Sequence, residues 1–445
     1  MAEIYPFRAL RYNPKRVPDL GQAVTQPYDK ISPEMQARYY KLSPFNLVRI
    51  IRGRQHPGDT RQDNVYTRAA RHFQDWIQED ILTSESEPAL YPYYQEYRVP
   101  DQTKSVKQRR GFIALCRLED YSRGIIHRHE ETLSAPKADR LELLKATRAH
   151  FGQIFMLYSD PAGAIERKLI PSSESKPWED VEDEYGTRHT VWRMSDPLMI
   201  ESVVTAMRDK KELVIADGHH RYETALAYRD YCRAQSLPDD RAEYVMMTFI
   251  PKESDGLTIL PTHRVVHGLP DFDWTRFASA SQRIFEWEEF PVQGRARDWG
   301  RRFAARLAEA GGQRPTLGVF ARKHDPAFLG LRKDVSLDSL LENIPAGLRR
   351  LDVVLLHLLL AEALGIDRQA VREERNLRYV REFVSALEEV ESGAAQVSFL
   401  MNPTPIEAVW SNALAGHPLP QKSTDFYPKL LSGLAIYWLD NPAGM

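Results

Sequence analysis

Residues 212–228, ELVIADGHHRYETALAY, join an apolar stretch typical of a buried strand directly to a stretch with helical spacing. If the strand ends at Asp217, Gly218 provides a flexible position for a tight turn, and a helix begins at once. The segment therefore predicts a strand–turn–helix junction. It also places an acid, a glycine, two histidines and an arginine at the point where the strand becomes a helix.

The rest of the chain predicts an α/β fold, or more broadly a mixed α+β fold. Segments that read as strands are 90–99, 109–118 and 242–251, and RPTLGVFAR with AFLGLRK reads as a hairpin. Segments that favour helices are 65–82, 196–209, 271–290, 294–311, 350–365 and 405–415. A helix is also expected after Ser32 as N-cap and Pro33 in the first turn.

The length of 445 residues predicts two or three packed subdomains. We expect an N-terminal α+β region at 1–120 and a core that carries the junction at 121–270. A C-terminal α/β region at 271–445 is expected to close the site.

Composition argues against several classes of function. The net charge of −2 and the pI near 6.7 disfavour a broad nucleic-acid-binding surface. The longest apolar run, 351–365, is too short for a membrane span and contains His357 and Glu362, so it predicts a buried helix. The start shows no signal-peptide pattern, and Cys116 and Cys232 form no CxxC pair. We expect a cytoplasmic protein with no membrane partner; its oligomeric state stays open.

The junction has the residues of an anion site. The first turn of a helix carries unpaired N–H groups and a partial positive charge, to which phosphate or carboxylate binds. Arg221 offers a bidentate clamp, and His219 and His220 offer hydrogen bonds or a proton. The alternative is that Asp217 only caps the helix.

His219 and Glu223 are four residues apart, but without HExxH we predict no tight metal site.

Two further clusters carry suitable chemistry. The first, HRHEETLSAPKADR at 127–140, combines a histidine and a carboxylate with cations; its candidates are His129, Glu130, Thr132, Lys137 and Arg140. A solvated loop is the alternative. The second, PQKSTDFYPKLLSGL at 420–434, offers two cations and two hydroxyls, Lys422, Ser423, Thr424 and Lys429, with a capped turn as the alternative. The chain has neither a GxxxxGK[ST] nor a GxGxxG loop.

The box ADGHHRYETA resembles the one that marks the ParB/sulfiredoxin-like superfamily, in which a strand ends in a D/E-G-x-x-R turn and starts a helix. Together with QPYD, HEET…KADR, PTHR and PQKSTDFYPKL, it resembles a large bacterial and archaeal family with a domain of unknown function. Among relatives with the box are sulfiredoxin, ParB and a free serine kinase whose box also reads D-G-H-H-R.

The resemblance to the serine kinase implies phosphoryl transfer between L-serine and O-phosphoserine, in either direction. Glu130 would be the base, and Asp217 and His220 would complete the catalytic group. The residues implied to hold phosphate or its metal are Asp217, His219, His220 and Arg221, with Gly218 at the turn. Mg²⁺ and a nucleotide or phosphate, as phosphoryl donor or acceptor, are the implied cofactors.

Two other functions stay open from the sequence. One is a nucleotide-binding switch or scaffold that resembles ParB and turns over little or no small molecule. The other is a DNA-binding protein or nuclease, against which the near-neutral charge counts. Phosphoryl transfer between L-serine and O-phosphoserine also requires that the three polar clusters meet in space.

Overall fold

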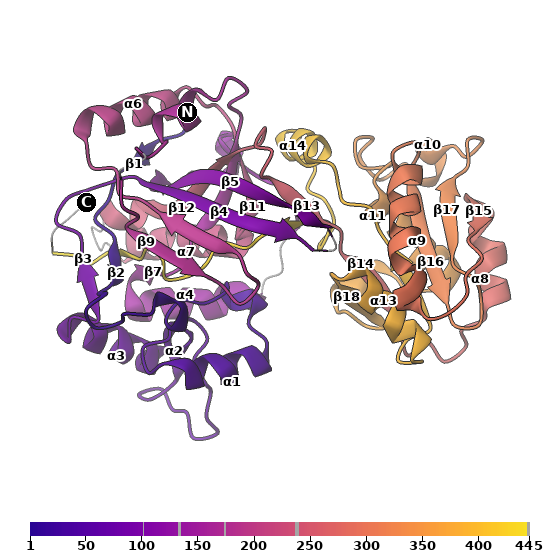
Figure 1. The fold of residues 1–445 in the computed structure, drawn as a ribbon, viewed down its shortest axis with the longest axis horizontal. Coiled ribbons are helices and arrows are strands. Elements are labelled where there is room, and N and C mark those ends of the chain that lie inside the picture. The colour runs from indigo at the N-terminus through magenta and orange to yellow at the C-terminus, as the bar shows by residue number, and fades with distance from the viewer. Residues whose placement is uncertain (101, 132–134, 173–174, 236–239, 443–445) are drawn as a thin grey trace. The chain divides into compact units, whose positions relative to one another are not determined.

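The computed structural model describes residues 1–100, 102–131, 135–172, 175–235 and 240–442 (Figure 1). The chain divides into two compact units. Unit 1 comprises Met1–Arg128, Thr132–Thr258 and Pro428–Met445, and unit 2 comprises His129–Glu131 and Ile259–Tyr427. The last residues of the chain therefore return to the unit in which it begins.

Unit 1 is built, within the described residues, on a nine-stranded mixed sheet. Its strands in chain order are β1 (Ile4–Tyr5), β4 (Tyr91–Val99), β5 (Gln102–Arg117), β6 (Ile126–Arg128), β8 (Ile154–Tyr158), β9 (Glu179–Glu182), β10 (Arg188–Val191), β11 (Leu213–Asp217) and β12 (Tyr244–Pro251). The order across the sheet is β6-β11-β8-β12-β5-β4-β10-β9, with β1 also on β5. The pairs β11–β6 and β12–β8 are parallel, and the others are antiparallel.

Unit 1 also contains helices and shorter elements around this sheet. The helices are α1 (Pro33–Leu42), α2 (Val48–Ile51), α3 (Val65–Gln78), α4 (Ala135–Thr147), α5 (Ala164–Lys168), α6 (Pro197–Arg208) and α7 (His219–Ala234). The short strand pairs are β2 (Leu10–Tyr12) with β3 (Leu82–Ser84), and β7 (Ala149–His150) with β21 (Tyr437–Trp438). Short 3-10 turns lie at Leu20–Gln22, Tyr28–Lys30, Tyr121–Arg123 and Asp240–Glu243.

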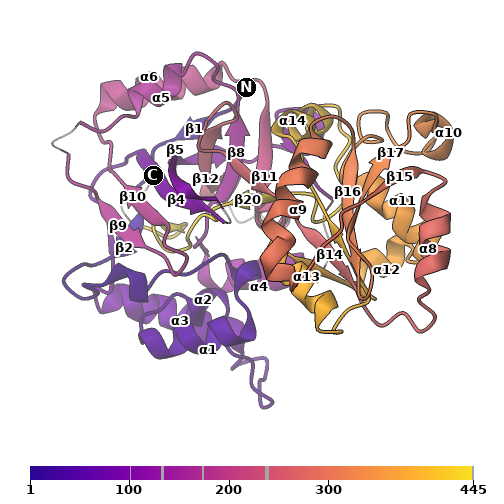
Figure 2. The ribbon, with the colours of Figure 1, turned by 45° about the vertical axis from the view of Figure 1, so that its right-hand side comes forward.

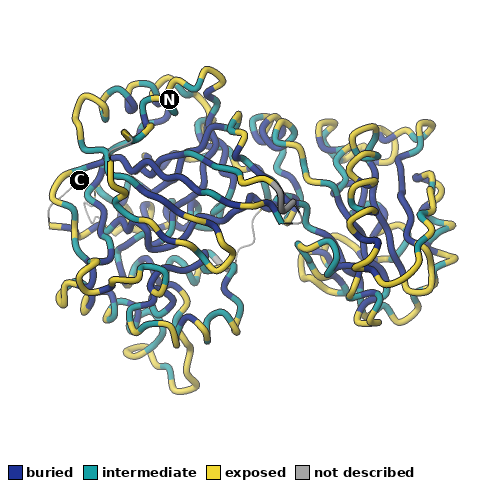
Figure 3. Tube along the Cα trace, viewed as in Figure 1, coloured by how far each residue is buried: buried dark blue, intermediate teal, exposed yellow. Residues whose placement is uncertain are grey.

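Two hydrophobic clusters of the described residues help to hold unit 1 together. One joins the sheet to α6 and α7, with Ile215, Val203 and Tyr222 among its buried members. The other packs the N-terminal helices against one another, around Phe73 and Trp76 of α3, and includes Ile436 from the end of the chain. Figure 1 shows α1, α2 and α3 grouped together, and Figure 3 shows the strands as the most deeply buried segments.

Unit 2 contains, within the described residues, a six-stranded antiparallel sheet in the order β15-β17-β16-β19-β14-β18. The strands are β14 (His263–Val266), β15 (Phe285–Glu289), β16 (Thr316–Ala321), β17 (Ala327–Leu331), β18 (Leu377–Val380) and β19 (Val397–Leu400). The helices are α8 (Trp274–Ser281), α9 (Ala296–Gly311), α10 (Leu337–Leu340), α11 (Asp352–Leu364), α12 (Arg368–Arg372), α13 (Phe383–Glu391) and α14 (Ile406–Leu414). Strand β20 is Asp425–Tyr427, and β13 (Thr258–Leu260) spans the boundary between the units.

Helices α9 and α13 lie side by side against the unit 2 sheet (Figure 2). Their buried faces meet through Trp299 and Phe303 of α9 and Leu387 of α13. The α9 side chains recur at intervals of four residues, which places them on one face of the helix. This amphipathic pattern explains why the segment folds as a helix on the sheet.

The mixed α/β fold is confirmed, and so are most of its predicted elements. Ser32 caps α1 by accepting a hydrogen bond from the Met35 N–H at 3.2 Å, with Pro33 in the first turn. The expectation of helix throughout 271–290 is wrong for its second half. There α8 ends at Ser281, and β15 pairs with β17 at the edge of the sheet. Tertiary pairing outweighs the local pattern in this segment.

Gly111 in β5 lies where the neighbouring strand β12 approaches closely. A Cβ atom there would lie 2.5 Å from the Phe249 carbonyl oxygen and 2.7 Å from Ile250 Cγ1, both on the neighbouring β12. Gly111→Ala should therefore push the two strands apart and destabilise the protein by about 1–3 kcal/mol. Thermal or urea unfolding measures the loss. Gly58→Ala is the control, because a Cβ at Gly58 meets nothing within 4 Å; equal stability of the two variants would contradict the prediction.

Candidate functional site

The predicted strand–turn–helix junction is present. β11 ends at Asp217, and α7 begins at His219, with Gly218 between them in a left-handed conformation at φ 94°. A Cβ on Gly218 would lie 2.9 Å from Arg221 Nε, so the turn also requires a residue without a side chain. The helix starts one residue after the turn, which brings its first turn next to the end of the strand.

Asp217 does not cap this helix. Gly218 occupies the N-cap position, and no side chain makes a cap hydrogen bond there. Instead, Asp217 Oδ2 accepts a hydrogen bond from Arg221 Nη2 at 3.0 Å, and Oδ1 lies 3.7 Å from Lys429 Nζ. Lys429 comes from the C-terminal segment and is buried. The carboxylate therefore ties the end of the chain to the junction.

The electrostatics of the junction are dominated by cations. Burial by itself would raise the pKa of Asp217, but Lys429, Arg221, Lys30 and His219 outweigh it and hold that pKa well below its usual range. Asp217 is therefore an anion at neutral pH. Its single negative charge is set against Lys429, Arg221 and Lys30, an arrangement that suits a further anion.

Buried polar groups fix the position of Lys429. Arg109 of β5 donates from Nε to Gln95 Oε1 at 3.0 Å, and its Nη2 donates to the Pro428 carbonyl oxygen. Gln95 of β4 in turn donates to the Lys429 carbonyl oxygen at 2.9 Å. Burial lowers the pKa of Arg109 to about 10, so it keeps its charge at neutral pH. The backbone at 428–429 is thus anchored on the central strands of the sheet.

Arg221 also faces a pocket that contains a second predicted residue. Its Nη1 donates to the Gln153 carbonyl oxygen at 2.5 Å, and the same pocket is lined by Tyr28, Arg140 and His150. The Arg140 guanidinium lies 4.3 Å from the centre of the Tyr28 ring and donates to the Ile51 carbonyl oxygen at 2.7 Å. The fold thus brings Arg140 and Arg221, which are far apart in sequence, to one pocket.

The other predicted residues of unit 1 lie on or beside α7. His219 and His220 occupy its first turn and are both half-buried. Lys137 of α4 forms an ion pair with Glu223, one turn further along α7. The predicted residue Thr132 lies outside the described residues.

The remaining predicted residues come together in unit 2. Glu130 Oε1 accepts a hydrogen bond from the Lys422 backbone N–H at 3.0 Å, and the His129 ring Nε2 lies 2.7 Å from Thr424 Oγ1. Lys422 itself adopts a left-handed conformation at φ 58°. Ser423 Oγ donates to the Pro420 carbonyl oxygen at 2.5 Å. The predicted clusters at 127–140 and 420–434 therefore meet through His129 and Glu130.

A buried arginine reinforces this unit 2 group. Arg264 donates from Nη2 to the Lys422 carbonyl oxygen at 2.9 Å. Burial lowers its pKa to about 10, and the nearby Tyr379 and Glu130 oppose that shift. Arg264 therefore stays charged and fixes the backbone of the segment that holds Glu130.

Sequence reasoning missed Lys30, Arg109 and Gln95 as members of the site, whereas Lys429 was among the cations expected in the segment 420–434. Lys30 follows the motif QPYD directly, without standing out as a ligand. Arg109 begins the strand RRGFIALCRL, and a charged residue in a predicted buried strand is the signal that would have found it.

Comparison with known proteins places the chain in a family. A profile of one protein family matches residues 4–354, most of the chain. The chain belongs to that family, whose description is "Protein of unknown function (DUF1015)". A search of curated proteins found no match.

Several solved structures are similar at low levels. A conserved hypothetical protein from Pyrococcus furiosus has 12% identity and a TM-score of 0.35, covering 72% of this chain and 94% of its own. A free serine kinase in complex with AMP has 12% identity and a TM-score of 0.34, covering 70% and 90%. SbnI from Staphylococcus aureus, truncated at its C-terminus, has 9% identity and a TM-score of 0.34, covering 74% and 89%. Identities and TM-scores this low carry no information about the substrate of this chain.

No helix among the described residues combines the length and apolar character needed to cross a membrane. No group of three or more His, Cys, Asp or Glu side chains among them is arranged to hold a metal ion.

The depressed pKa of Asp217 predicts a specific pH dependence. Its stabilising charge is present above the pKa of an unfolded aspartate, about 3.9, and is lost as the pH falls toward the lower folded pKa. The difference in unfolding free energy between wild type and Asp217→Asn should be largest near neutral pH and shrink below about pH 4. Urea unfolding between pH 7 and pH 3 measures this difference.

Asp209→Asn is the matched control for this experiment. Asp209 is an exposed carboxylate at the C-cap of α6. Its substitution should change stability little at any of these pH values. If Asp217→Asn gives an equally flat profile, the charge cluster does not stabilise the fold as described.

Proposed function

We propose that this protein catalyses phosphoryl transfer between L-serine and O-phosphoserine, with the phosphate held at the junction of β11 and α7. The observation that carries the proposal is the cluster of three cationic side chains around Asp217 in the described part of the chain, namely Lys429, Arg221 and Lys30. The DGHHR order of the junction, which resembles that of the free serine kinase, supports the choice of substrate.

The chemistry asks mainly for positioning and charge neutralisation. In the kinase direction, the serine hydroxyl oxygen forms a bond to phosphorus of a nucleoside phosphate, and the bond from phosphorus to the leaving oxygen breaks. The hydroxyl proton passes to a base. In the reverse direction, O-phosphoserine supplies the phosphoryl group to a nucleotide, phosphate or water.

The residues of unit 1 can fill the anion-holding roles. Arg221 offers N–H donors in a planar fork, and Lys429 offers a buried ammonium group. The first turn of α7, with His219 and His220, adds the positive end of a helix dipole. His220 is proposed to donate or accept a proton on the transferred group.

The cations at the junction fit a phosphate better than a bare metal ion. Asp217 already has Arg221 and Lys429 as partners, and the positive field there would repel a divalent cation. Mg²⁺ would therefore be held chiefly by phosphate oxygens of the nucleotide. The proposed roles of the protein residues do not depend on it.

Phosphorus NMR of the purified protein tests the proposal. One arm supplies serine with ADP or ATP, and the other supplies O-phosphoserine alone or with AMP, ADP or phosphate, each with and without Mg²⁺. We expect wild-type turnover in at least one arm. Arg221→Gln should lower kcat/KM by about 100-fold or more, because it removes a charge-assisted donor to the phosphoryl group. Asp217→Ala should also lose activity.

Arg233→Gln is the matched control, because Arg233 lies in the last turn of the same helix and pairs with Glu243. It should keep wild-type activity. A kcat/KM in Arg221→Gln equal to that of the wild type would overturn the assigned site. Nucleotide binding without any turnover would instead support a nucleotide-binding switch, and binding of DNA that weakens steeply with salt would support the nucleic-acid alternative.

A further inference from the structure

A second cationic pocket lies in the N-terminal helices of unit 1. It is formed by the end of α1, by α2, by the start of α3 and by the loop that joins α2 to α3. Its polar lining includes Tyr40, Lys41, Arg49, Arg54, Arg68 and two histidines, His56 and His72. Neither Asp217 nor Arg221 belongs to it.

Two arginines share one aromatic ring in this pocket. The guanidinium carbon of Arg54 lies 4.1 Å from the centre of the Tyr40 ring, and that of Arg49 lies 4.6 Å from it. Arg49 also donates from Nη2 to the Tyr40 carbonyl oxygen at 3.0 Å. Tyr40 thus holds two like charges near each other, which raises the positive potential between them.

This positive charge is not balanced locally. No carboxylate among the described residues forms an ion pair with Lys41, Arg49 or Arg54. The Nε–H of Arg49 is buried and has no hydrogen-bond acceptor in the described part of the chain. A buried donor without a partner costs free energy.

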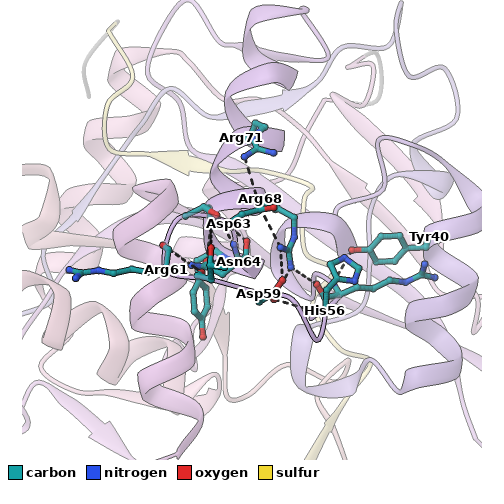
Figure 4. Close-up of polar contacts among 12 residues, drawn as sticks. Tyr40, His56, Asp59, Arg61, Asp63, Asn64, Arg68 and Arg71 are labelled. Atoms are coloured by element: carbon teal, nitrogen blue, oxygen red, sulfur yellow. Dashed lines mark hydrogen bonds and ion pairs between the residues drawn. The ribbon is translucent and has the colours of Figure 1, made fainter.

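The loop beside the pocket is held in place by a separate set of contacts (Figure 4). Arg68 donates to both oxygens of Asp59, at 2.7 Å and 2.9 Å, and to the Arg54 carbonyl oxygen at 2.9 Å. Tyr40 Oη accepts from the Arg54 backbone N–H at 3.0 Å. The charge of Arg68 is therefore used to fix the loop, and Arg54 is presented in a preformed position.

We propose that this pocket binds a phosphate-bearing small molecule. Two guanidinium forks and a lysine are suited to the several oxygens and the double negative charge of a phosphate group. An adjoining hollow shares Gly53, Arg54 and His56 with the pocket and leaves room for more than one phosphate group. The pocket itself contains none of Arg140, Asp217 and Arg221, although Arg140 lines the adjoining hollow, and its occupancy does not depend on phosphoryl transfer.

Calorimetric titration with pyrophosphate tests the proposal, with Arg221→Gln as the parent protein so that binding at the junction is weakened. The parent should still bind pyrophosphate. Adding Arg54→Gln should raise its Kd by about tenfold or more, because a charge-assisted hydrogen bond is lost. Arg54 is exposed, so the variant should keep the parental melting temperature. Arg49→Gln should weaken binding in the same way.

Arg71→Gln is the matched control. Arg71 lies on α3 near Arg68, is 62% exposed, and does not line the pocket. It should leave the Kd within about twofold of the parent. Equal weakening by Arg71→Gln and Arg54→Gln would show only general charge screening and overturn the proposal. Failure of the Arg221→Gln parent to bind pyrophosphate would also overturn it. Serine turnover is measured separately in Arg54→Gln. This activity depends only on the site proposed at the junction of β11 and α7.

Discussion

The contact between Asp217 and Lys429 links the middle of the chain to its C-terminal segment within unit 1. Asp217 ends a strand in the middle of the chain, whereas Lys429 follows the return of the chain from unit 2. A buried ammonium group is costly unless it has a partner, so the position of Lys429 depends on this carboxylate. Arg109 and Gln95 hold the adjacent backbone, which couples the charge cluster to the central strands of the sheet.

The two cationic sites of unit 1 are built in different ways. The junction gathers Lys30, Asp217, Arg221 and Lys429 from segments far apart in sequence. The pocket around Tyr40 is assembled from residues between Tyr40 and His72, and a local network centred on Arg68 supports it. The first site therefore depends on the complete fold of unit 1, while the second depends mainly on the packing of three neighbouring helices.

The strand–turn–helix at Asp217–His219, the cap at Ser32 and the pairing of β4 with β5 could all be predicted, because local pattern and backbone chemistry decide them. The segment at 285–289 could not, since its pairing with β17 outweighs its helical pattern. The role of Asp217 was only half predictable. Its sequence position allows either a helix cap or an ion-pair partner, and the nearby cations decide for the second.

The sequence by itself determined where the chain turns from strand to helix and which residue types stand there, because glycine and hydrophobic periodicity act over a few residues. Only the tertiary structure decided which charges surround Asp217 and that two arginines share the ring of Tyr40. It also brought His129 and Glu130 against the segment 419–424. Electrostatic and hydrogen-bonding interactions depend on distance in space, and distance between remote segments is fixed by packing rather than by local sequence.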